Sequence, residues 1–195
     1  ERWQKVIIGI SGKKRSGKDT IYELVKKRAG GFVIRAAFGD QIKEEVAQVT
    51  GVEVGHIEEN KERFRPMLQW WGADFRRHYN GESYWLDRML FRMRSIRDPK
   101  VLVITDVRYP NEAELVKKVG GILLRVDRET GLNDAHSSEN LLDSFCDFDY
   151  RLENNGTLED LEEKVARIVA EHCCAAPISR VEPGLATVGR TEIVR

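Results

Sequence analysis

A glycine-rich loop near the start of the chain constrains the fold more than any other segment. Residues 9–20 read Gly-Ile-Ser-Gly-Lys-Lys-Arg-Ser-Gly-Lys-Asp-Thr, in which Gly12, four residues, Gly17 and Lys18 form the pattern G-x-x-x-x-G-K. An apolar, strand-like run over residues 6–10 precedes the loop, and a helix-like run follows it. In this context the glycines let backbone N–H groups curl around phosphate oxygens, and the helix points its positive end at the same anion. The segment therefore predicts a phosphate-binding loop, in which Lys18 supplies a charge for the β- and γ-phosphates.

The loop departs from the usual pattern at one position. The residue after the lysine is usually Ser or Thr, whose hydroxyl binds Mg²⁺, but here it is Asp19, with Thr20 one step later. Asp19 either reaches a metal ion through water or only places its charge at the positive end of the helix. The expected ligands are ATP and Mg²⁺, and the candidate ATP-binding residues of the loop are Gly12, Lys14, Ser16, Gly17, Lys18, Asp19 and Thr20.

Composition excludes several other classes of function. Basic and acidic residues balance at 32 each in the 195 residues, so no basic excess points to a nucleic acid polymer. The three cysteines are an odd number without metal-binding spacing or a disulfide framework, which fits a reducing cytoplasm. No apolar run approaches the roughly 18 residues that a membrane span needs. We therefore expect a cytoplasmic protein that needs no membrane.

Strand-like and helix-like runs alternate along the chain. The clearest is Val101-Leu-Val-Ile-Thr105, a continuous apolar run typical of a strand buried on both faces. The other predicted strands cover 5–10, 32–38, 122–126 and 150–153, and the predicted helices cover 20–28, 40–49, 111–119 and a segment that opens with the capping-box pattern Thr157-Leu-Glu-Asp160. Residues 51–99 carry no clear strand and read as helices, one entered near Pro66 and another over 84–96. This alternation predicts a parallel α/β sheet covered by helices on both faces.

Charged side chains follow two of the predicted strands, where ligands bind in sheets of this kind. Asp40 and Lys43 come after the second strand, one helical turn apart, and taken alone they read as a surface pair. Asp106 ends the third strand in the place of a Walker B acid, which positions Mg²⁺ or its waters. Arg108 lies two residues further on and can donate two hydrogen bonds to a phosphate, unless it only pairs with Asp106 beside the next helix.

The middle of the chain resembles a particular family, the bacteriophage-type deoxynucleoside monophosphate kinases of the P-loop nucleoside monophosphate kinase superfamily. Their pattern of Leu-Gln, two residues, Gly-Thr-Glu, two residues and Arg is matched by Leu68-Gln69, Gly72, Ala73-Asp74 in place of Thr-Glu, and Arg77. Other segments also match, namely the loop itself, 106–112, 125–128 with 134–139, and 154–157. Together the matched stretches are spread over residues 6–172, and this ordered set is far more specific than the loop alone.

The resemblance implies an α/β P-loop kinase fold, with a parallel sheet flanked by helices, a helical acceptor-binding insertion and a short lid. The kinase domain would span residues 1–172, with the acceptor-binding region at 51–99 and the lid at 127–139, and residues 173–195 would form a C-terminal tail. The implied reaction is direct in-line transfer of the ATP γ-phosphoryl group to a deoxynucleoside monophosphate, assisted by Mg²⁺. Related kinases are often homodimers, which leaves a homodimer open, and a viral protein would work in the host cytoplasm.

Specific roles follow from the residues and the resemblance together. Gln69 offers a donor and an acceptor to a base edge, and Arg77 offers a clamp for the acceptor phosphate. Arg125 and Arg128 lie on opposite faces if the strand continues through both, and Arg128 is chosen as the lid's charge-neutralising group because it is nearer the loop. The candidate catalytic residues are Lys18, Asp106, Arg108 and Arg128; the substrate-binding residues are Asp40, Lys43, Gln69, Asp74, Arg77 and Arg108; the metal-holding residues are Asp106 and, through water, Asp19; and the ATP site is completed by Asn155, Gly156 and Thr157.

Two alternatives remain open at this point. The first is a P-loop kinase for another small phosphorylated acceptor, because phosphomevalonate kinase shares the unusual loop and an Asp-Val-Arg string, and dephospho-coenzyme A is a further acceptor of this size. The second is a non-catalytic, nucleotide-binding regulator that has lost its acceptor site. The Leu-Gln…Gly…Arg segment favours the nucleotide acceptor, and the retained Asp40, Lys43, Arg77, Arg108 and Arg128 argue against a regulator.

Overall fold

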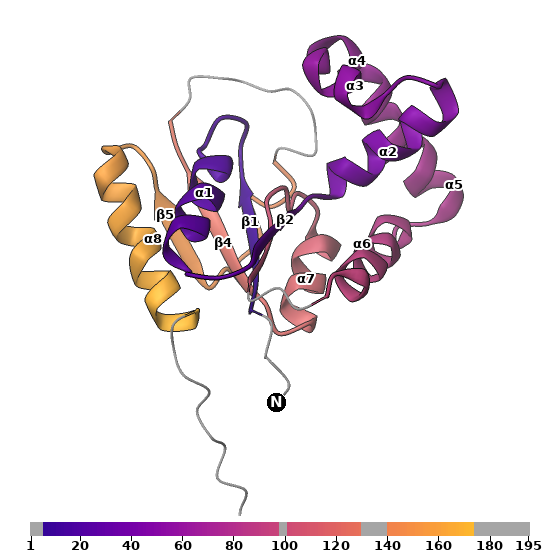
Figure 1. The fold of residues 1–195 in the computed structure, drawn as a ribbon. Helices are drawn as coiled ribbons and strands as arrows, with labels where there is room; N and C mark the ends of the chain where they lie inside the picture. The colour runs from indigo at the N-terminus through magenta and orange to yellow at the C-terminus, as the bar shows by residue number, and fades with distance from the viewer. Residues whose placement is uncertain (1–5, 98–100, 130–139, 174–195) are drawn as a thin grey trace, which may run out of the picture.

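A computed structural model describes residues 6–97, 101–129 and 140–173 of the chain (Figure 1). Within them, one parallel sheet has the strand order β2-β3-β1-β4-β5, so β1, which leads into the phosphate loop, lies at its centre. The strands are β1 (Val6–Gly12), β2 (Val33–Ala36), β3 (Val101–Ile104), β4 (Ile122–Asp127) and β5 (Tyr150–Glu153). This arrangement confirms the expected α/β fold with a parallel sheet.

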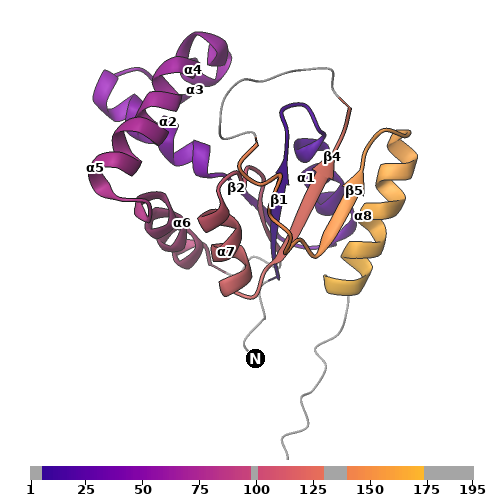
Figure 2. The same cartoon turned by 180° about the vertical axis from the view of Figure 1, so that it is seen from behind.

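Helices cover both faces of the sheet. Because side chains alternate along a strand, Ile8 and Ile10 face one helical layer and Ile7 faces the other. The first layer is α1 (Lys18–Arg28) with α8 (Leu158–His172), and the second is α6 (Tyr84–Ser95) with α7 (Pro110–Lys118), as Figures 1 and 2 show from opposite sides. Two apolar cores, one on each face, therefore hold the central strand and its loop in place.

The last helix is delimited as the sequence predicts. The Thr157 hydroxyl accepts a hydrogen bond from the Asp160 N–H, and the Asp160 carboxylate accepts one from the Thr157 N–H, which completes the capping box. At the other end Cys173 is buried in the same core, so it belongs to the packed domain and not to the expected tail. The remainder of that tail, residues 174–195, lies outside the described residues.

A helical region stands beside the sheet at the level of the phosphate loop (Figures 1 and 2). It consists of α2 (Phe38–Thr50), α3 (Val54–Glu59), α4 (Lys61–Gln69), the π-helix η1 (Trp70–Arg77) and α5 (His78–Asn80), followed by α6. The prediction that a helix is entered near Pro66 was wrong, because Pro66 lies inside α4, five residues after its start at Lys61. A proline lacks the N–H of the helical ladder, but α4 continues past it to Gln69, and the π-helix begins at Trp70.

The helices of this structure are short relative to a lipid bilayer. No helix within the described residues is long and apolar enough to span a membrane.

Candidate functional site

The phosphate loop takes the shape that its glycines allow. Gly17 has a φ of 104°, a left-handed conformation that other residues rarely adopt, and it precedes the first turn of α1. A Cβ at Gly17 would lie 2.4 Å from Asn154 Nδ2, which donates a 2.8 Å hydrogen bond to the Ser16 carbonyl. Lys18 Nζ donates to the carbonyl oxygens of Gly12 at 2.6 Å and Lys13 at 2.7 Å. The loop is therefore supported from within the chain, with Lys18 folded onto it and Asn154 as a support that the sequence analysis did not identify.

A cavity of about 470 Å³ lies between the phosphate loop and the helical region. Nine basic and five acidic side chains line it, an excess of four positive charges on a chain whose formal net charge is zero. Lys14, Arg15 and Lys18 approach from the loop, and Arg65 and Arg77 from the helical region. Its volume falls within the usual range for small-molecule sites, and its charge suits an anionic ligand.

Many of the predicted site residues meet in this cavity. They come from the loop, from the ends of β2 and β3, and from the helical region: Lys14, Lys18, Asp19, Asp40, Lys43, Gln69, Arg77, Asp106 and Arg108. The sheet order explains the meeting, because β1 and β3 are neighbours and their carboxyl ends lie at one edge. The predicted donor and acceptor residues thus border one continuous space.

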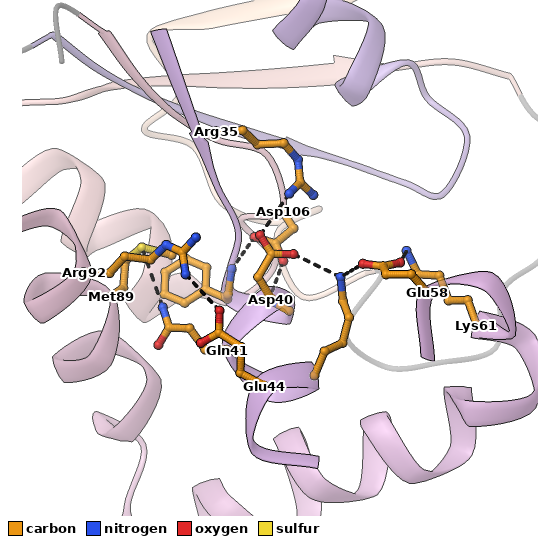
Figure 3. A network of polar contacts seen from close by, with 12 residues as sticks. Arg35, Asp40, Gln41, Glu44, Glu58, Lys61, Met89, Arg92 and Asp106 are labelled. Atoms are coloured by element: carbon orange, nitrogen blue, oxygen red, sulfur yellow. Dashed lines mark hydrogen bonds and ion pairs between the residues drawn. The ribbon is translucent and has the colours of Figure 1, made fainter. Parts of the chain in front are cut away.

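Asp40 and Lys43 form the pair that their spacing predicts, but not on the surface. Their atoms Oδ1 and Nζ are 3.0 Å apart, and Asp40 Oδ2 also accepts from Arg35 at 2.9 Å. Lys43, which is nearly buried, also bonds to Glu58 on α3, and Figure 3 shows Asp40 and Glu58 facing each other across this contact. Burial alone would lower the pKa of Lys43, but the hydrogen bonds to Glu58 and Asp40 outweigh it and raise the pKa. Lys43 is therefore held as a cation at the cavity wall.

Asp106 joins the end of β3 to the first turn of α2. Its two carboxylate oxygens accept hydrogen bonds from the Phe38 and Gly39 N–H groups, each at 2.8 Å. Burial raises the pKa of Asp106, although these two bonds and the nearby Arg108 act against the rise. The carboxylate also lines the cavity, so it supports the helix that carries Asp40 and Lys43 while it faces the ligand space. It is not simply paired with Arg108, the alternative that the sequence left open.

Arg77 lies in a buried ion pair at the wall of the cavity. Its Nη2 donates to Glu112 Oε1 at 2.6 Å, and only 5% and 3% of the two side chains are exposed. The guanidinium also stacks on the Tyr109 ring, with 3.6 Å between its carbon and the ring centroid. Burial raises the pKa of Glu112 to about 7, even though Arg77 acts to lower it. The sequence analysis gave Glu112 no role, although a glutamate shortly after a proline that opens a helix is a helix-start signal.

A second buried carboxylate, Glu45, organises the helical region. It accepts hydrogen bonds from Trp71 Nε1 at 2.9 Å and Arg76 Nε at 2.7 Å, and from the Tyr84 hydroxyl. Burial would raise its pKa, but these three bonds lower it. Glu45 therefore connects α2, η1 and α6, and nothing in the local sequence singles it out.

Several predicted residues lie away from the cavity. Asp74 is exposed on η1 and does not line it. Asn155, Gly156 and Thr157 are exposed before α8, where Asn155 Oδ1 accepts from the Glu129 N–H and Thr157 caps the helix. Their proposed contacts with a nucleotide gain no support from these positions.

The two arginines of β4 and its loop are placed differently from one another. Arg128 is exposed, whereas Arg125 is buried and donates to Asp127, Asp143 and Ser11. Both arginines border a hollow of about 290 Å³ that Lys13 of the phosphate loop also lines. Because β4 ends at Asp127, Arg128 lies beyond the strand, and the condition for the predicted alternation is not met. Most of the expected lid, residues 130–139, lies outside the described residues.

The donors available to a metal ion are few. Within the described residues no group of three or more His, Cys, Asp or Glu side chains is placed to hold a metal. Asp19 and Asp106 nevertheless both line the cavity. Mg²⁺ commonly binds through one or two carboxylates together with substrate phosphates and water, so this donor set fits Mg²⁺ better than a metal held by protein ligands alone.

The chain is similar to a protein-family model, a curated relative and several solved structures. The sequence model of the phosphomevalonate kinase family matches residues 10–120. A putative deoxynucleotide monophosphate kinase of Acanthamoeba polyphaga mimivirus is 31% identical over 188 residues, which cover 84% of this chain and 96% of that protein. Similar solved structures include TT1252 from Thermus thermophilus, with 21% identity, a TM-score of 0.49, and coverage of 86% and 98% of the two chains. Shikimate kinase from Aquifex aeolicus has 14% identity, a TM-score of 0.48, and coverage of 85% and 97%.

Proposed function

Because the chain belongs to the P-loop kinase family that the phosphomevalonate kinase model and the mimivirus deoxynucleotide monophosphate kinase represent, we propose that it phosphorylates a small phosphorylated acceptor. The proposed acceptor is a deoxynucleoside monophosphate, the donor is ATP, and the product is the deoxynucleoside diphosphate. The mimivirus relative carries that activity in its name, and the Leu68-Gln69 to Arg77 segment resembles the pattern of such kinases.

The observation that carries this proposal is one cavity lined by basic side chains from two parts of the fold. Lys14 and Lys18 belong to the phosphate loop, and Lys43 and Arg77 come from the helical region, where each is also paired with a carboxylate. The loop side chains suffice for a triphosphate, so we assign the others to a second phosphorylated molecule. A regulator that only senses ATP has no use for that second set of charges.

The residues have distinct tasks in the proposed reaction. The loop N–H groups and Lys18 hold the donor phosphates, and Arg77, Arg108 and Lys43 hold the acceptor phosphate. Mg²⁺, with Asp19 and Asp106 as its candidate holders, would neutralise charge on the phosphates. The reaction passes through a loose transition state, so the protein contributes positioning and charge and needs no covalent intermediate.

Phosphomevalonate is the second candidate acceptor. The matching family model spans residues 10–120 and therefore includes both the phosphate loop and the helical region. Its acceptor is also a phosphate monoester, which the same basic side chains of the helical region would bind. Gln69 lines the cavity with an amide that can pair with a base edge, which favours a base over the short hydroxy acid of phosphomevalonate.

An acceptor panel tests the proposal directly. ADP formation from ATP and Mg²⁺ is measured with each deoxynucleoside and ribonucleoside monophosphate, with phosphomevalonate and with dephospho-coenzyme A. We expect at least one deoxynucleoside monophosphate to give the highest kcat/KM, and Lys18→Ala to abolish the signal. Turnover confined to phosphomevalonate or dephospho-coenzyme A would replace the acceptor, and tight ATP binding without turnover of any acceptor would favour the regulator.

A further inference from the structure

Glu112 uses both of its carboxylate oxygens at the junction of the cavity. Oε1 accepts from Arg77 Nη2 at 2.6 Å, and Oε2 accepts from the Arg108 N–H at 2.9 Å and the Tyr109 N–H at 3.2 Å. The carboxylate therefore bridges the end of η1 and the loop between β3 and α7. Because two backbone groups fix Oε2, Glu112 cannot follow Arg77 if that side chain moves.

Arg77 has a second carboxylate within reach. Glu82, between α5 and α6, lies 3.3 Å from Arg77 Nη1, and its side chain is 75% exposed. Glu112 is shielded from water and closer, so its hydrogen bond is the stronger of the two. Without Glu112, the guanidinium would be held only by the Tyr109 ring and by its longer contacts with Glu82, whose side chain faces solvent.

We propose that Glu112 is the positioning residue of the acceptor site: it holds the Arg77 guanidinium at the cavity wall in a fixed relation to Arg108. This inference rests on the proposed function, in which both arginines bind the acceptor phosphate. Arg77 belongs to the helical region and Arg108 to the loop after β3, so the distance between them depends on how the helical region contacts the sheet. The Glu112 carboxylate makes that contact, because it accepts hydrogen bonds from the guanidinium of Arg77 and from the backbone N–H of Arg108.

The arrangement of charges supports a positioning role over a purely structural one. Replacing the buried pair by apolar groups would stabilise a core at least as well, because burying two charges costs about as much as their attraction returns. The pair is instead placed where the Arg77 guanidinium borders the ligand space and stacks on Tyr109. A stacked guanidinium keeps its plane fixed, which favours bidentate binding of phosphate.

The test compares Glu112→Gln with Glu82→Gln, which changes the other carboxylate near the same arginine. The acceptor is first chosen with the wild-type enzyme from the panel above, and KM values for acceptor and ATP are then measured separately. We expect Glu112→Gln to raise the acceptor KM about tenfold or more, with the ATP KM within about twofold of wild type, and Glu82→Gln to leave both near wild type. Adding Arg77→Lys to Glu112→Gln should then raise the acceptor KM little further, because both changes remove the same positioned group.

The outcomes separate this inference from the proposed function. An equal rise in both KM values, a lower kcat with unchanged KM values, or tighter acceptor binding in Glu112→Gln would overturn the positioning role while leaving the reaction intact. Absence of wild-type turnover with every acceptor would instead overturn the proposed function. If Glu112→Gln does not fold, Glu112→Asp keeps the charge but shortens the reach, and an acceptor KM unchanged from wild type in this variant also overturns the inference.

Discussion

The phosphate loop and the helical region border the same cavity but are held in shape by different means. The loop is held mainly by glycine conformations and backbone groups, since Gly17 is left-handed and the Ser16 carbonyl accepts a hydrogen bond from Asn154. The helical region and its contact with the sheet are held by buried carboxylates. Glu45 connects three helices, and Glu112 connects Arg77 to the β3–α7 loop. One side of the site is therefore set by main chain, and the other by side chains.

Under the proposed function, this difference would let the donor side stay constant while the acceptor side changes. A loop shaped by backbone binds the phosphates common to all nucleoside triphosphates and tolerates many neighbouring side chains. A wall shaped by buried ion pairs changes its geometry when one partner changes, because the other is left without its counter-charge. We therefore expect substitutions in the loop to affect catalysis, and substitutions in the helical region to affect folding or the choice of acceptor.

The largest effect is expected at the loop. Lys18→Ala removes the charge that the proposed reaction places at the transferred group, and the loss of one such group typically costs about 3–4 kcal/mol, or roughly a hundred- to a thousandfold in kcat. Thermal stability should stay close to wild type, because Lys18 Nζ bonds to carbonyls of its own loop. The control is Lys26→Ala on the exposed face of the same helix α1. A kcat for Lys18→Ala within a few-fold of wild type would contradict this role.

The next effect concerns folding of the helical region. Glu45→Ala leaves Trp71, Arg76 and Tyr84 without their shared acceptor, and removing one partner of a buried network costs about 3 kcal/mol. In a domain of this size the loss corresponds to a midpoint lower by roughly 10 °C. Glu44→Ala is the matched control, because this neighbour on α2 is 45% exposed and pairs only with Arg92 among the contacts described. The thermal midpoints of the two variants should differ clearly, and equal midpoints would show that Glu45 does not stabilise the helical region.

A smaller and more selective effect is expected at Arg77. Arg77→Lys keeps the charge that neutralises Glu112, so the fold should persist. A single ammonium cannot reproduce the stacked, two-pronged guanidinium, and we expect the acceptor KM to rise about tenfold while the ATP KM stays within about twofold. Separate titration of each substrate measures this split. An equal rise in the KM values of both substrates would show that Arg77 supports the fold and does not bind the acceptor selectively. The two sides of the site would then not be functionally distinct.

The two sides also differ in how much the sequence predicts of them. The strand–loop–helix pattern, the buried strand at 101–104 and the capping box at Thr157 predict the sheet and the loop well, because each depends on neighbours along the chain. Glu45 and Glu112 bind side chains 26 to 39 positions away, so no local pattern identifies these partners. The helix-start signal at Glu112 points only to its contacts with the Arg108 and Tyr109 N–H groups. Pro66 shows the same limit, since it was expected to start a helix and instead lies within one.

The smallest effect is expected where the two regions touch at the surface. Glu62 on α4 bonds to Arg65 and, at 3.3 Å, to Lys14 of the phosphate loop, and its side chain is 73% exposed. The hydrogen bonds from Arg65 and Lys14 lower the pKa of Glu62 to about 2. Solvent and salt screen such a contact, so Glu62→Gln should change the ATP KM less than about twofold and the thermal midpoint by no more than about a degree.

The sign of its pH dependence follows from the lowered pKa of Glu62. The Glu62 carboxylate contributes fully to the free energy of unfolding above its ordinary pKa of 4.5, and this contribution is lost as the pH falls toward about 2. Any difference in stability between wild type and Glu62→Gln should therefore shrink in acid. Thermal midpoints at pH 7 and at about pH 3, inside the window between the two pKa values, together with ATP KM values at low and high salt, check both statements. A tenfold change in the ATP KM at low salt would show that this bridge clamps the helical region to the loop. The donor side would then depend on side chains as much as the acceptor side does.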